Sequence, residues 1–470
     1  MINSFDIFDT LIAREVKNPI DIFIIMENVL KIENFANNRI KSEEISQTIY
    51  GKNNNINNIY VELQKILKID NNEIEKIKIL ELDTEYKNSI PIVSNINKIK
   101  DDDIYVSDMY LTSNQIYNLL NKHNININNK LYVTAGGKAD ESIYKYLINN
   151  YNINQHLGDN YISDIINAQK YNIKTKHTTI SKFTDVENFL YDNKCYFFQK
   201  LIRRYRLLNP YQEDTNEFII YNQQITYNIP ILIIFSQQIN DIIINENLDK
   251  VLFLSRDCCL LIKIFKKLYP NINCMYFYSS RIINKMGGID YKKYIKENIN
   301  TKSLIIDLNG SFNSGRELYK ECLGFYPRCH LLQYDTFKPP FNTLSYLIKN
   351  IELDSFLNSK YPNIYNKLVK FHHFIEVLNY DLDGTLLLYV ENINLNYYNE
   401  NNEKYIKISH NLIENFIKEL ELKDIEQIQN YKEFILNIYS LIFKNYNKKD
   451  FYILDPPKLI NNKILKKIYK

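Results

Sequence analysis

The sequence contains little glycine, no tryptophan and no excess of either charge. Only 10 of its 470 residues are glycine, and 58 basic residues balance 55 acidic ones to a net charge of +3. Nucleic acids and anionic membranes select strongly basic surfaces, so this balance argues against both as partners. With 45% apolar and 24% charged residues, the composition is that of a globular protein.

Neither a cysteine framework nor a long apolar run is present. The six cysteines include no C-x-x-C pair, and no histidine cluster completes a zinc site. The longest apolar run, residues 229–235, is far short of the roughly 20 residues that cross a membrane. Asp6 and Asp9 stand where a signal peptide needs an apolar segment. We therefore expect free thiols, no membrane insertion and a cytoplasmic location.

The chain is too long for one ordinary hydrophobic core, so we expect two domains. Apolar residues at three- and four-residue spacing predict helices through most of residues 18–99. Short apolar strands alternate with helices around that region, and again after Asn209-Pro210. This alternation predicts α/β domains with parallel sheets. The expected divisions are an α/β domain over 1–181 with a cap at about 15–100, a helical linker over 182–209, a second α/β domain over 210–355 and a mostly helical region over 356–470.

Polar residues at expected strand ends and at one helix start have the properties of a phosphoryl-transfer site. Asp6 lies at the end of the first strand, where α/β sheets bind ligands, and its carboxylate can attack phosphorus. Thr10, four residues on, can hold the transferred oxygens. Ser107 ends a later strand with a hydroxyl suited to a phosphoryl oxygen. Lys138 begins a helix, where its ammonium can neutralise phosphate charge and keep Asp6 ionised.

Two carboxylates on one later loop complete this set. The run Gly158-Asp159-Asn160, with Asp164 close behind, offers hard oxygen ligands of the kind that suit Mg²⁺. The chain order is thus nucleophile, hydroxyl, lysine and acidic loop, each after a strand or at a helix start. Such an order favours a functional site over four independent coincidences.

The four segments resemble the four motifs of the haloacid dehalogenase (HAD) superfamily. The runs SFDIFDTLIAR, FANNRI, VSDMYLT and LGDNYISD are similar to a bacterial subgroup of predicted HAD hydrolases linked to surface-polysaccharide loci, and the likeness extends to LFLSRD, SSR and IIDLNG. The resemblance implies a HAD-like Rossmannoid sheet with a helical cap inserted after the first strand. It also implies a Mg²⁺-dependent phosphatase acting on a small phosphorylated substrate. The implied roles are Asp6 as nucleophile, Ser107 and Lys138 as phosphate-binding residues, and Asp6, Asp159, Asp164 and the backbone carbonyl of Phe8 as metal ligands.

Phe8 departs from the pattern of this family. HAD phosphatases usually carry a second Asp at this position, which protonates the leaving group and later activates water. Phenylalanine cannot transfer a proton, and strand alternation is expected to point the neighbouring Asp9 elsewhere. Three hypotheses follow: a weak phosphohydrolase, an enzyme limited to substrates with good leaving groups, or a catalytically impaired HAD fold that serves as a ligand-binding or scaffold module. Dehalogenases also lack this acid but do not need the metal loop, so Asp159 and Asp164 favour phosphate chemistry.

In the second half, small and polar residues follow three expected strands. Residues 304–307 lead into a small-residue loop over 309–315, which loosely resembles the diphosphate-binding loop of phosphoribosyltransferases. The glycine spacing also resembles a P-loop, but Arg316 and Glu317 replace the required Lys and Ser/Thr and argue against ATP hydrolysis. Structural arginines paired with nearby acids are the alternative interpretation. The predicted anion-binding residues are Arg256, Asp257, Arg281, Asp307, Gly310, Ser311, Ser314 and Gly315.

Residues 380–386, Tyr-Asp-Leu-Asp-Gly-Thr-Leu, match the first HAD motif more closely than the N-terminal run does. They follow residues 374–379, whose pattern indicates a helix end rather than a buried strand. No acidic loop and no convincing lysine motif comes after them. We therefore interpret this segment as an Asp-Gly turn between two elements and not as a second site.

Overall fold

The computed structural model describes residues 2–255, 257–279, 283–284, 287–310, 312–334, 343–344, 375–380, 386–390 and 400–422, with a few positions up to 441. The chain divides into two compact units. Unit 1 comprises Met1–Thr184 and Arg203–Glu213, and unit 2 comprises Asp185–Ile202 and Asp214–Lys470. The segment 203–213 belongs to unit 1 because Arg203 and Arg206 donate hydrogen bonds to the backbone carbonyls of Arg14 and of residues 180–182.

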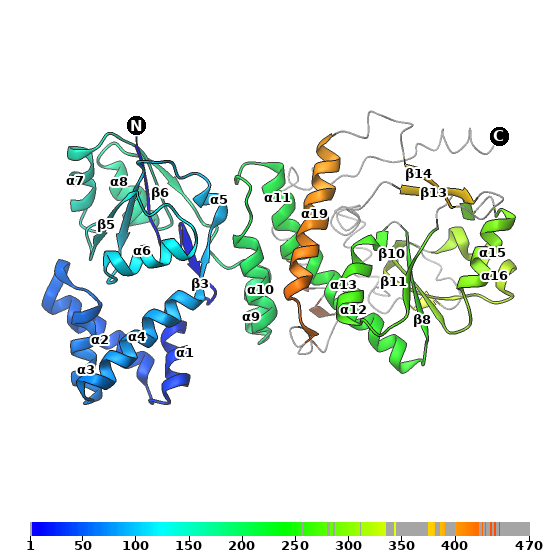
Figure 1. The fold of residues 1–470 in the computed structure, drawn as a ribbon, viewed down its shortest axis with the longest axis horizontal. Helices are drawn as coiled ribbons and strands as arrows, with labels where there is room; N and C mark the ends of the chain where they lie inside the picture. The colour runs from blue at the N-terminus through cyan, green and yellow to red at the C-terminus, as the bar shows by residue number, and fades with distance from the viewer. Residues whose placement is uncertain are drawn as a thin grey trace. The chain divides into compact units, whose positions relative to one another are not determined.

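Unit 1 is built on a five-stranded sheet in the order β5-β4-β1-β6-β7, in which every pair is parallel (Figure 1). The expected α/β class with a parallel sheet is confirmed. Counted along the chain, the order is 3-2-1-4-5, so the order of strands reverses between β1 and β6. The strands are β1 (Ile2–Phe5), β4 (Ile104–Asp108), β5 (Lys130–Thr134), β6 (Ile153–Gly158) and β7 (Lys174–His177).

Helices cover both faces of this sheet, so its central strands are buried on both sides. Tyr105 of β4 packs in one core cluster with residues of α6, while Ile104 and Val106 pack in another with α7 and α8. Thr112 begins α6 with a capping box that it forms with Gln115. The helices are α5 (Val93–Ile96), α6 (Ser113–Lys122), α7 (Ser142–Asn150), the π-helix η2 (Tyr161–Ile166) and α8 (Asn167–Gln169).

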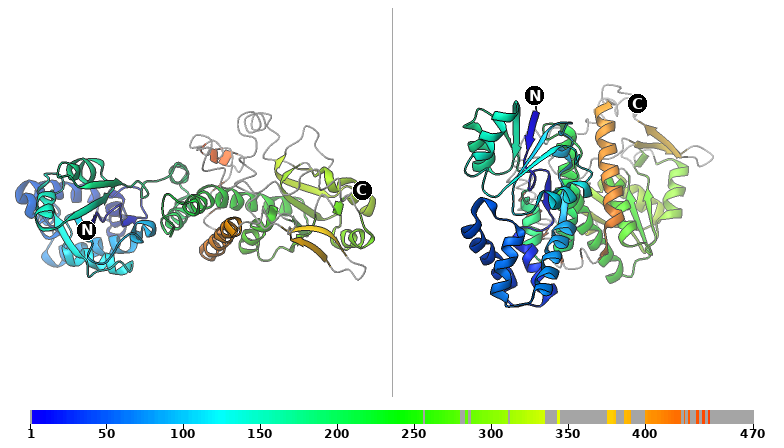
Figure 2. Two further views of the ribbon diagram at one scale, coloured as in Figure 1. Left: turned by 90° about the horizontal axis from the view of Figure 1, so that it is seen from above. Right: turned by 60° about the vertical axis from the view of Figure 1, so that its left-hand side comes forward.

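A helical cap is inserted between β1 and β4, and its helices lie together beyond one end of the sheet (Figures 1 and 2). Its base is a short antiparallel pair, β2 (Ile12–Arg14) and β3 (Ser89–Pro91), which the sequence pattern did not predict. Asn55 and Asp70 cap the third and fourth helices with side-chain oxygens. The cap elements are α1 (Ile20–Leu30), α2 (Phe35–Tyr50), η1 (Gly51–Asn53), α3 (Ile56–Leu67) and α4 (Asn71–Asn88).

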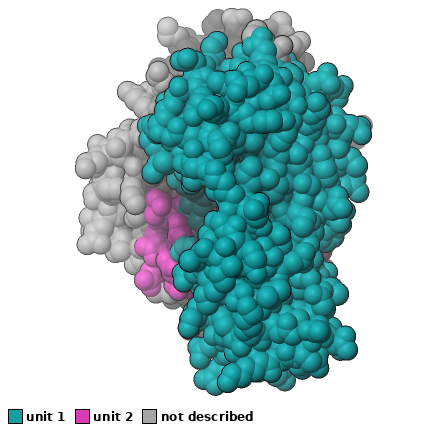
Figure 3. All heavy atoms as spheres, turned by 90° about the vertical axis from the view of Figure 1, so that its left-hand side faces the viewer, with its two compact units in different colours: residues 1–184, 203–213 teal, residues 185–202, 214–470 magenta. Residues whose placement is uncertain are grey.

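The cap and the sheet share one hydrophobic core. Phe5, Ile7 and Leu11 belong to the same buried cluster as Phe23 of α1 and Phe35 of α2. Figure 3 shows one face of this unit in teal. Because the shared core fixes the cap on the loops that follow β1 and β4, cap residues can line a site at those strand ends.

His123 links the end of α6 to the base of the cap and should make stability depend on pH. Burial, and then the adjacent Lys122, lower the pKa of His123 from its ordinary 6.5 to about 4. Between these values the unfolded chain binds a proton that the folded chain does not, so stability falls as the pH falls through this window. We expect wild type to lose roughly 1–2 kcal/mol more than His123→Gln between pH 7 and 4, after discounting for partial exposure. Urea denaturation of both proteins at several pH values measures this; parallel curves would contradict it.

Unit 2 contains a second five-stranded parallel sheet, in the order β12-β11-β10-β8-β9. Its strands are β8 (Lys250–Leu254), β9 (Cys274–Phe277), β10 (Ser303–Gly310), β11 (Arg328–Tyr334) and β12 (Thr343–Leu344). Strand order reverses between β8 and β10. The helical elements described here are α9 (Asp185–Asp192), α10 (Tyr196–Leu207), α11 (Asn216–Gln223), η3 (Gln224–Asn228), α12 (Ile229–Asn245), η4 (Asp257–Cys259), α13 (Leu261–Leu268), α15 (Ile289–Asn298), α16 (Asn313–Leu323) and α19 (Glu400–Glu419).

The helix end that we expected before residue 380 is wrong. β13 (Ile375–Tyr380) and β14 (Leu386–Val390) form an antiparallel pair, and the helix α19 follows them in the chain. Residues 375–379 are therefore part of a strand and not a helix end. The β-branched Ile375 and Val377 and the aromatic Tyr380 favour this conformation. The Asp-Gly segment 381–385 between the two strands lies outside the described residues.

One helical run in the described part of the chain, Asn216–Asn245, is long and apolar enough to cross a membrane by length and composition. Of its most apolar window, 78% is buried inside the protein. Residues 229–235 are all fully buried. The core helix of a globular domain passes the same test, and this degree of burial fits that interpretation. All six cysteines are free thiols, as expected.

Candidate functional site

Asp6 lies directly beyond β1, at the point where the strand order of unit 1 reverses. Its backbone N–H donates to the Leu157 carbonyl of β6 at 2.9 Å, and its residue exposure is 5%. Asp159 follows β6, so these two carboxylates flank the switch point between β1 and β6. Open α/β sheets bind ligands in the crevice at this position.

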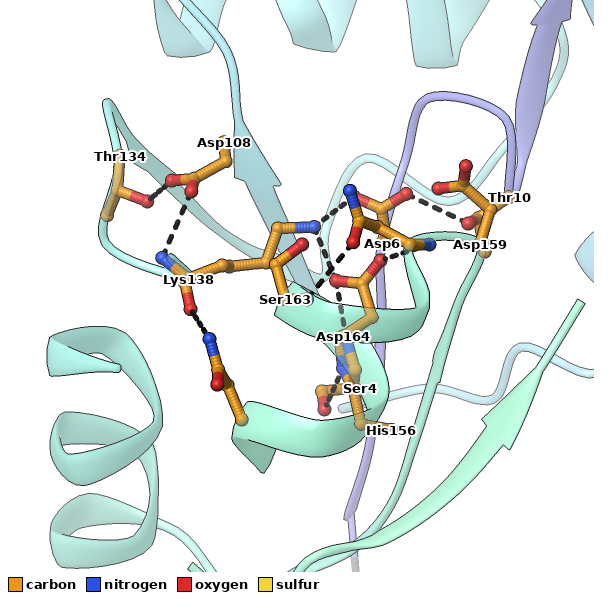
Figure 4. Close-up of polar contacts among 12 residues, drawn as sticks. Ser4, Asp6, Thr10, Asp108, Thr134, Lys138, His156, Asp159, Ser163 and Asp164 are labelled. Atoms are coloured by element: carbon orange, nitrogen blue, oxygen red, sulfur yellow. Dashed lines mark hydrogen bonds and ion pairs between the residues drawn. The ribbon is translucent and has the colours of Figure 1, made fainter. Parts of the chain in front are cut away.

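A tight turn after Asp6 holds its carboxylate in place. The N–H groups of Leu11 and Ile12 both donate to the Ile7 carbonyl, at 2.8 and 2.9 Å. The hydroxyl of Thr10 then donates to Oδ2 of Asp6 at 2.8 Å (Figure 4). Asp9 occupies this turn with a φ of 59°, so strand alternation does not govern its direction as we expected.

Lys138 joins two carboxylates of the site. Its ammonium lies 2.5 Å from Oδ1 of Asp6 and 2.7 Å from Oδ1 of Asp164, and its side chain is 5% exposed (Figure 4). Burial alone would lower the pKa of Lys138, but Asp6 and Asp164 outweigh burial and raise it. Burial raises the pKa of Asp6, and Lys138 opposes that effect. The lysine therefore stays charged and favours the ionised form of Asp6.

A buried histidine orients Asp164. His156 Nε2 lies 3.3 Å from Oδ1 of Asp164, and its Nδ1 lies 2.8 Å from the hydroxyl of Ser4 (Figure 4). Burial would raise the pKa of Asp164, but contacts with His156 and Lys138 lower it. A side chain at Gly158 would overlap Asp164, so this position has to be glycine. The sequence analysis missed His156 because a histidine within a strand gives no local signal of its partner.

Asp6, Asp159 and Asp164 together could hold a metal ion. Each offers a carboxylate oxygen, and these oxygens lie within 4.8 Å of one another. Burial, followed by the charges of Asp6, Asp9 and Asp164, raises the pKa of Asp159 to about 8. Three crowded carboxylates with one lysine suit a hard divalent cation, which would relieve this repulsion. Phe8, whose carbonyl was predicted as a further ligand, lies in the turn after Asp6 with its ring 5.1 Å from the Arg14 guanidinium.

Ser107 is a predicted member of the N-terminal site that no described hydrogen bond joins to the other members. It is buried at the end of β4, and among the described residues no hydrogen bond connects its hydroxyl to Asp6. Its neighbour Asp108, which sequence reasoning missed, accepts hydrogen bonds from the N–H groups of Gly136, Gly137 and Lys138 at 3.0–3.1 Å. Asp108 thereby fixes the loop that directs Lys138 to Asp6.

A cavity of about 350 Å³ lies between the cap and the loops that follow β4 and β5. The cap sequence alone showed no pocket, because its lining comes from segments far apart in the chain. The lining residues are Pro19, Phe23, Glu43, Gln47, Asn54, Glu85, Asp108, Met109, Tyr110, Ala135 and Gly136.

In unit 2 most of the small-residue segment that we expected to form an anion-binding loop belongs instead to a strand and a helix. β10 runs on to Gly310 and α16 begins at Asn313, so only residues 311–312 connect them, not the expected loop over 309–315. Ser314 and Gly315 lie in the first turn of α16, and Gly315 packs on Asn284 and Tyr319.

Two other predicted residues of unit 2 lie in or after neighbouring strands of its sheet. Asp307 lies within β10 and accepts a hydrogen bond from the Leu308 N–H at 2.8 Å. Asp257 begins η4, after β8, which is the neighbour of β10. Arg256, Arg281 and Ser311 lie outside the described residues.

Comparison with known proteins does not assign this chain to a family. No family model matches the sequence, and no curated protein is similar enough to match it. The function has to be inferred from the chemistry of the site itself.

Proposed function

We propose that unit 1 is a Mg²⁺-dependent, HAD-like phosphohydrolase that acts on a small phosphoester such as a sugar phosphate. The observation that carries the proposal is the buried contact of Lys138 with both Asp6 and Asp164, at 2.5 and 2.7 Å. A lysine between two carboxylates at a switch point provides an ionised nucleophile beside a fixed positive charge. Asp159, close by, completes an acidic set that fits Mg²⁺.

In the proposed reaction a carboxylate oxygen of Asp6 forms a bond to phosphorus, the bond from phosphorus to the ester oxygen breaks, and that oxygen takes a proton from water to leave as the alcohol. Thr10 and Lys138 hold Asp6 through its two oxygens, so the carboxylate is oriented before substrate arrives. Water then releases phosphate from the aspartyl-phosphate and restores Asp6. Mg²⁺ held by Asp6, Asp159 and Asp164, with the Phe8 carbonyl, would neutralise the charge of the phosphoryl group.

Phe8 should limit the rate, because the departing ester oxygen needs a proton that phenylalanine cannot give. We expect Phe8→Asp to raise kcat for alkyl phosphates by about 10²-fold, the low end for a general acid. We expect the low end of that range because the Arg14 guanidinium, 5.1 Å from the Phe8 ring, would favour the ionised form of the new carboxyl. An activated aryl phosphate, whose leaving group needs no proton, serves as the control and should gain little. Equal gains on both substrates would contradict the role assigned to this position.

The test is phosphate release from a panel of sugar phosphates and an activated aryl phosphate, with and without Mg²⁺. The proposal expects release that requires Mg²⁺ and depends on Asp6. Folded protein that releases no phosphate from any substrate would overturn it. That result would favour the alternative, an impaired HAD fold that acts as a ligand-binding or scaffold module.

For unit 2 we propose a binding site for a phosphorylated ligand, as in a phosphoribosyltransferase-like domain. Its support is the strand order, which places Asp257 and Asp307 beside the switch between β8 and β10. Hydrogen exchange should slow in residues 250–259 and 303–315 when a pentose phosphate is added. No slowing in either segment would contradict this site.

A further inference from the structure

The cavity of unit 1 shares a loop with the proposed catalytic site. Ala135 and Gly136 line it, and the same loop carries Lys138, whose ammonium contacts Asp6. Asp108 lines it too, and holds that loop through three backbone N–H groups. A phosphoryl group at Asp6 would thus place the rest of its ester next to this cavity. At about 350 Å³ the cavity is at the small end of ligand pockets, which span about 300–1,000 Å³.

Three residues of the lining are acidic. They are Glu43, Glu85 and Asp108, and none of the described lining residues is Lys, Arg or His. Glu85 is 4% exposed and bonds to Arg14, while the oxygens of Asp108 accept bonds from its loop. Glu43 differs, because its side chain is 40% exposed although it contacts Arg39. Glu43 is therefore the carboxylate best able to accept hydrogen bonds from a ligand.

Other residues of the lining are apolar or aromatic. These are Pro19, Phe23, Met109 and Tyr110, and the amides of Gln47 and Asn54 add neutral polar groups. Arg39, whose guanidinium lies 4.6 Å from the Phe23 ring and 4.9 Å from the Tyr110 ring, is fully buried and is not a lining residue. Positive charge at this cavity is therefore confined to arginines outside the described lining.

We infer that this cavity selects the leaving group of the substrate, and that this group is an uncharged, hydroxyl-rich one of monosaccharide size. The inference rests on the proposed phosphohydrolase function. Sugar hydroxyls can donate hydrogen bonds to Glu43, and the C–H face of a sugar can pack on Phe23 and Tyr110. A second phosphate or a carboxylate on the substrate would meet these carboxylates, and no described residue of the lining is a cation that could pair with it. The cavity therefore rejects sugar bisphosphates and sugar-acid phosphates.

The experiment compares three matched ligands: a hexose monophosphate, the corresponding hexose bisphosphate and the corresponding aldonic-acid phosphate. Both kcat/KM and the Kd from calorimetry are measured with Mg²⁺ present. The variants are Glu43→Lys and Glu44→Lys; Glu44 is exposed on the same helix and does not line the cavity. Wild type should prefer the monophosphate, and Glu43→Lys should shift that preference towards the bisphosphate by about 10-fold or more. Glu44→Lys should leave it unchanged.

Each result has a distinct meaning. Equal or tighter binding of the bisphosphate by wild type would overturn the inference, as would equal shifts in the two variants. If no ligand is hydrolysed but calorimetry still shows the preference and its shift in Glu43→Lys, the phosphohydrolase proposal fails and the selective cavity stands. If phosphate is released without preference, the phosphohydrolase stands and the selective cavity fails.

Discussion

Asp6→Asn should reduce Mg²⁺-dependent phosphate release by more than about 10³-fold, because removing the nucleophile of a covalent mechanism removes the mechanism itself. The amide that replaces the carboxylate keeps its shape but cannot attack phosphorus. The substitution also takes one negative charge from the cluster with Asp159 and Asp164, so Mg²⁺ should bind more weakly. An assay of phosphate release measures the loss of rate, and titration calorimetry with Mg²⁺ measures the loss of metal affinity.

The loss should not arise from unfolding. Asp6 is 5% exposed and burial raises its pKa, so a neutral amide there avoids part of the cost of burying a charge. Thermal stability should therefore stay close to that of wild type. Asp9→Asn is the matched control, since Asp9 lies in the same turn and should change the rate by less than about 10-fold. A rate retained in Asp6→Asn, or lost equally in Asp9→Asn, would exclude Asp6 as the nucleophile.

Local sequence pattern was enough to find the groups that the structure gathers around Asp6. Thr10, Lys138 and Asp164 all contact it or one another, although Lys138 lies 132 residues from Asp6. The pattern works because parallel strands bring their carboxyl ends to one edge, so residues that follow strands meet. It also predicted the α/β class and the helices of the cap, whose apolar residues recur with helical spacing.

The same pattern failed where a residue's role depends on a distant partner. His156 orients Asp164 and Asp108 holds the Lys138 loop, but only the folded chain reveals those partners. The base of the cap, β2 with β3, consists of two three-residue strands that become visible only when they pair. In unit 2 the small residues after Asp307 suggested a loop, yet β10 continues through Gly310 because its backbone pairs with β11.

Arg39→Met should destabilise the cap by about 3–5 kcal/mol, the cost of leaving a buried charge without its partner. Arg39 and Glu81 are both fully buried, and two guanidinium nitrogens lie 2.7 and 2.8 Å from the two Glu81 oxygens. In this variant the Glu81 carboxylate still accepts a hydrogen bond from the Tyr60 hydroxyl, at 2.7 Å, but it no longer contacts the Arg39 cation. Hydrogen exchange of α2 and α4 in the whole protein measures the free energy of local opening.

The double variant Arg39→Met/Glu81→Leu distinguishes lost charge pairing from lost packing. Apolar side chains of similar volume remove both charges, so most of the stability should return. Lys87→Met, which breaks an exposed pair with Asp83, should change stability by no more than about 0.5 kcal/mol. If the double variant is as unstable as Arg39→Met, then Arg39 acts through its packing on Phe23 and Tyr110. Since those rings also line the cavity, the cap would then owe its stability and its ligand surface to the same contacts.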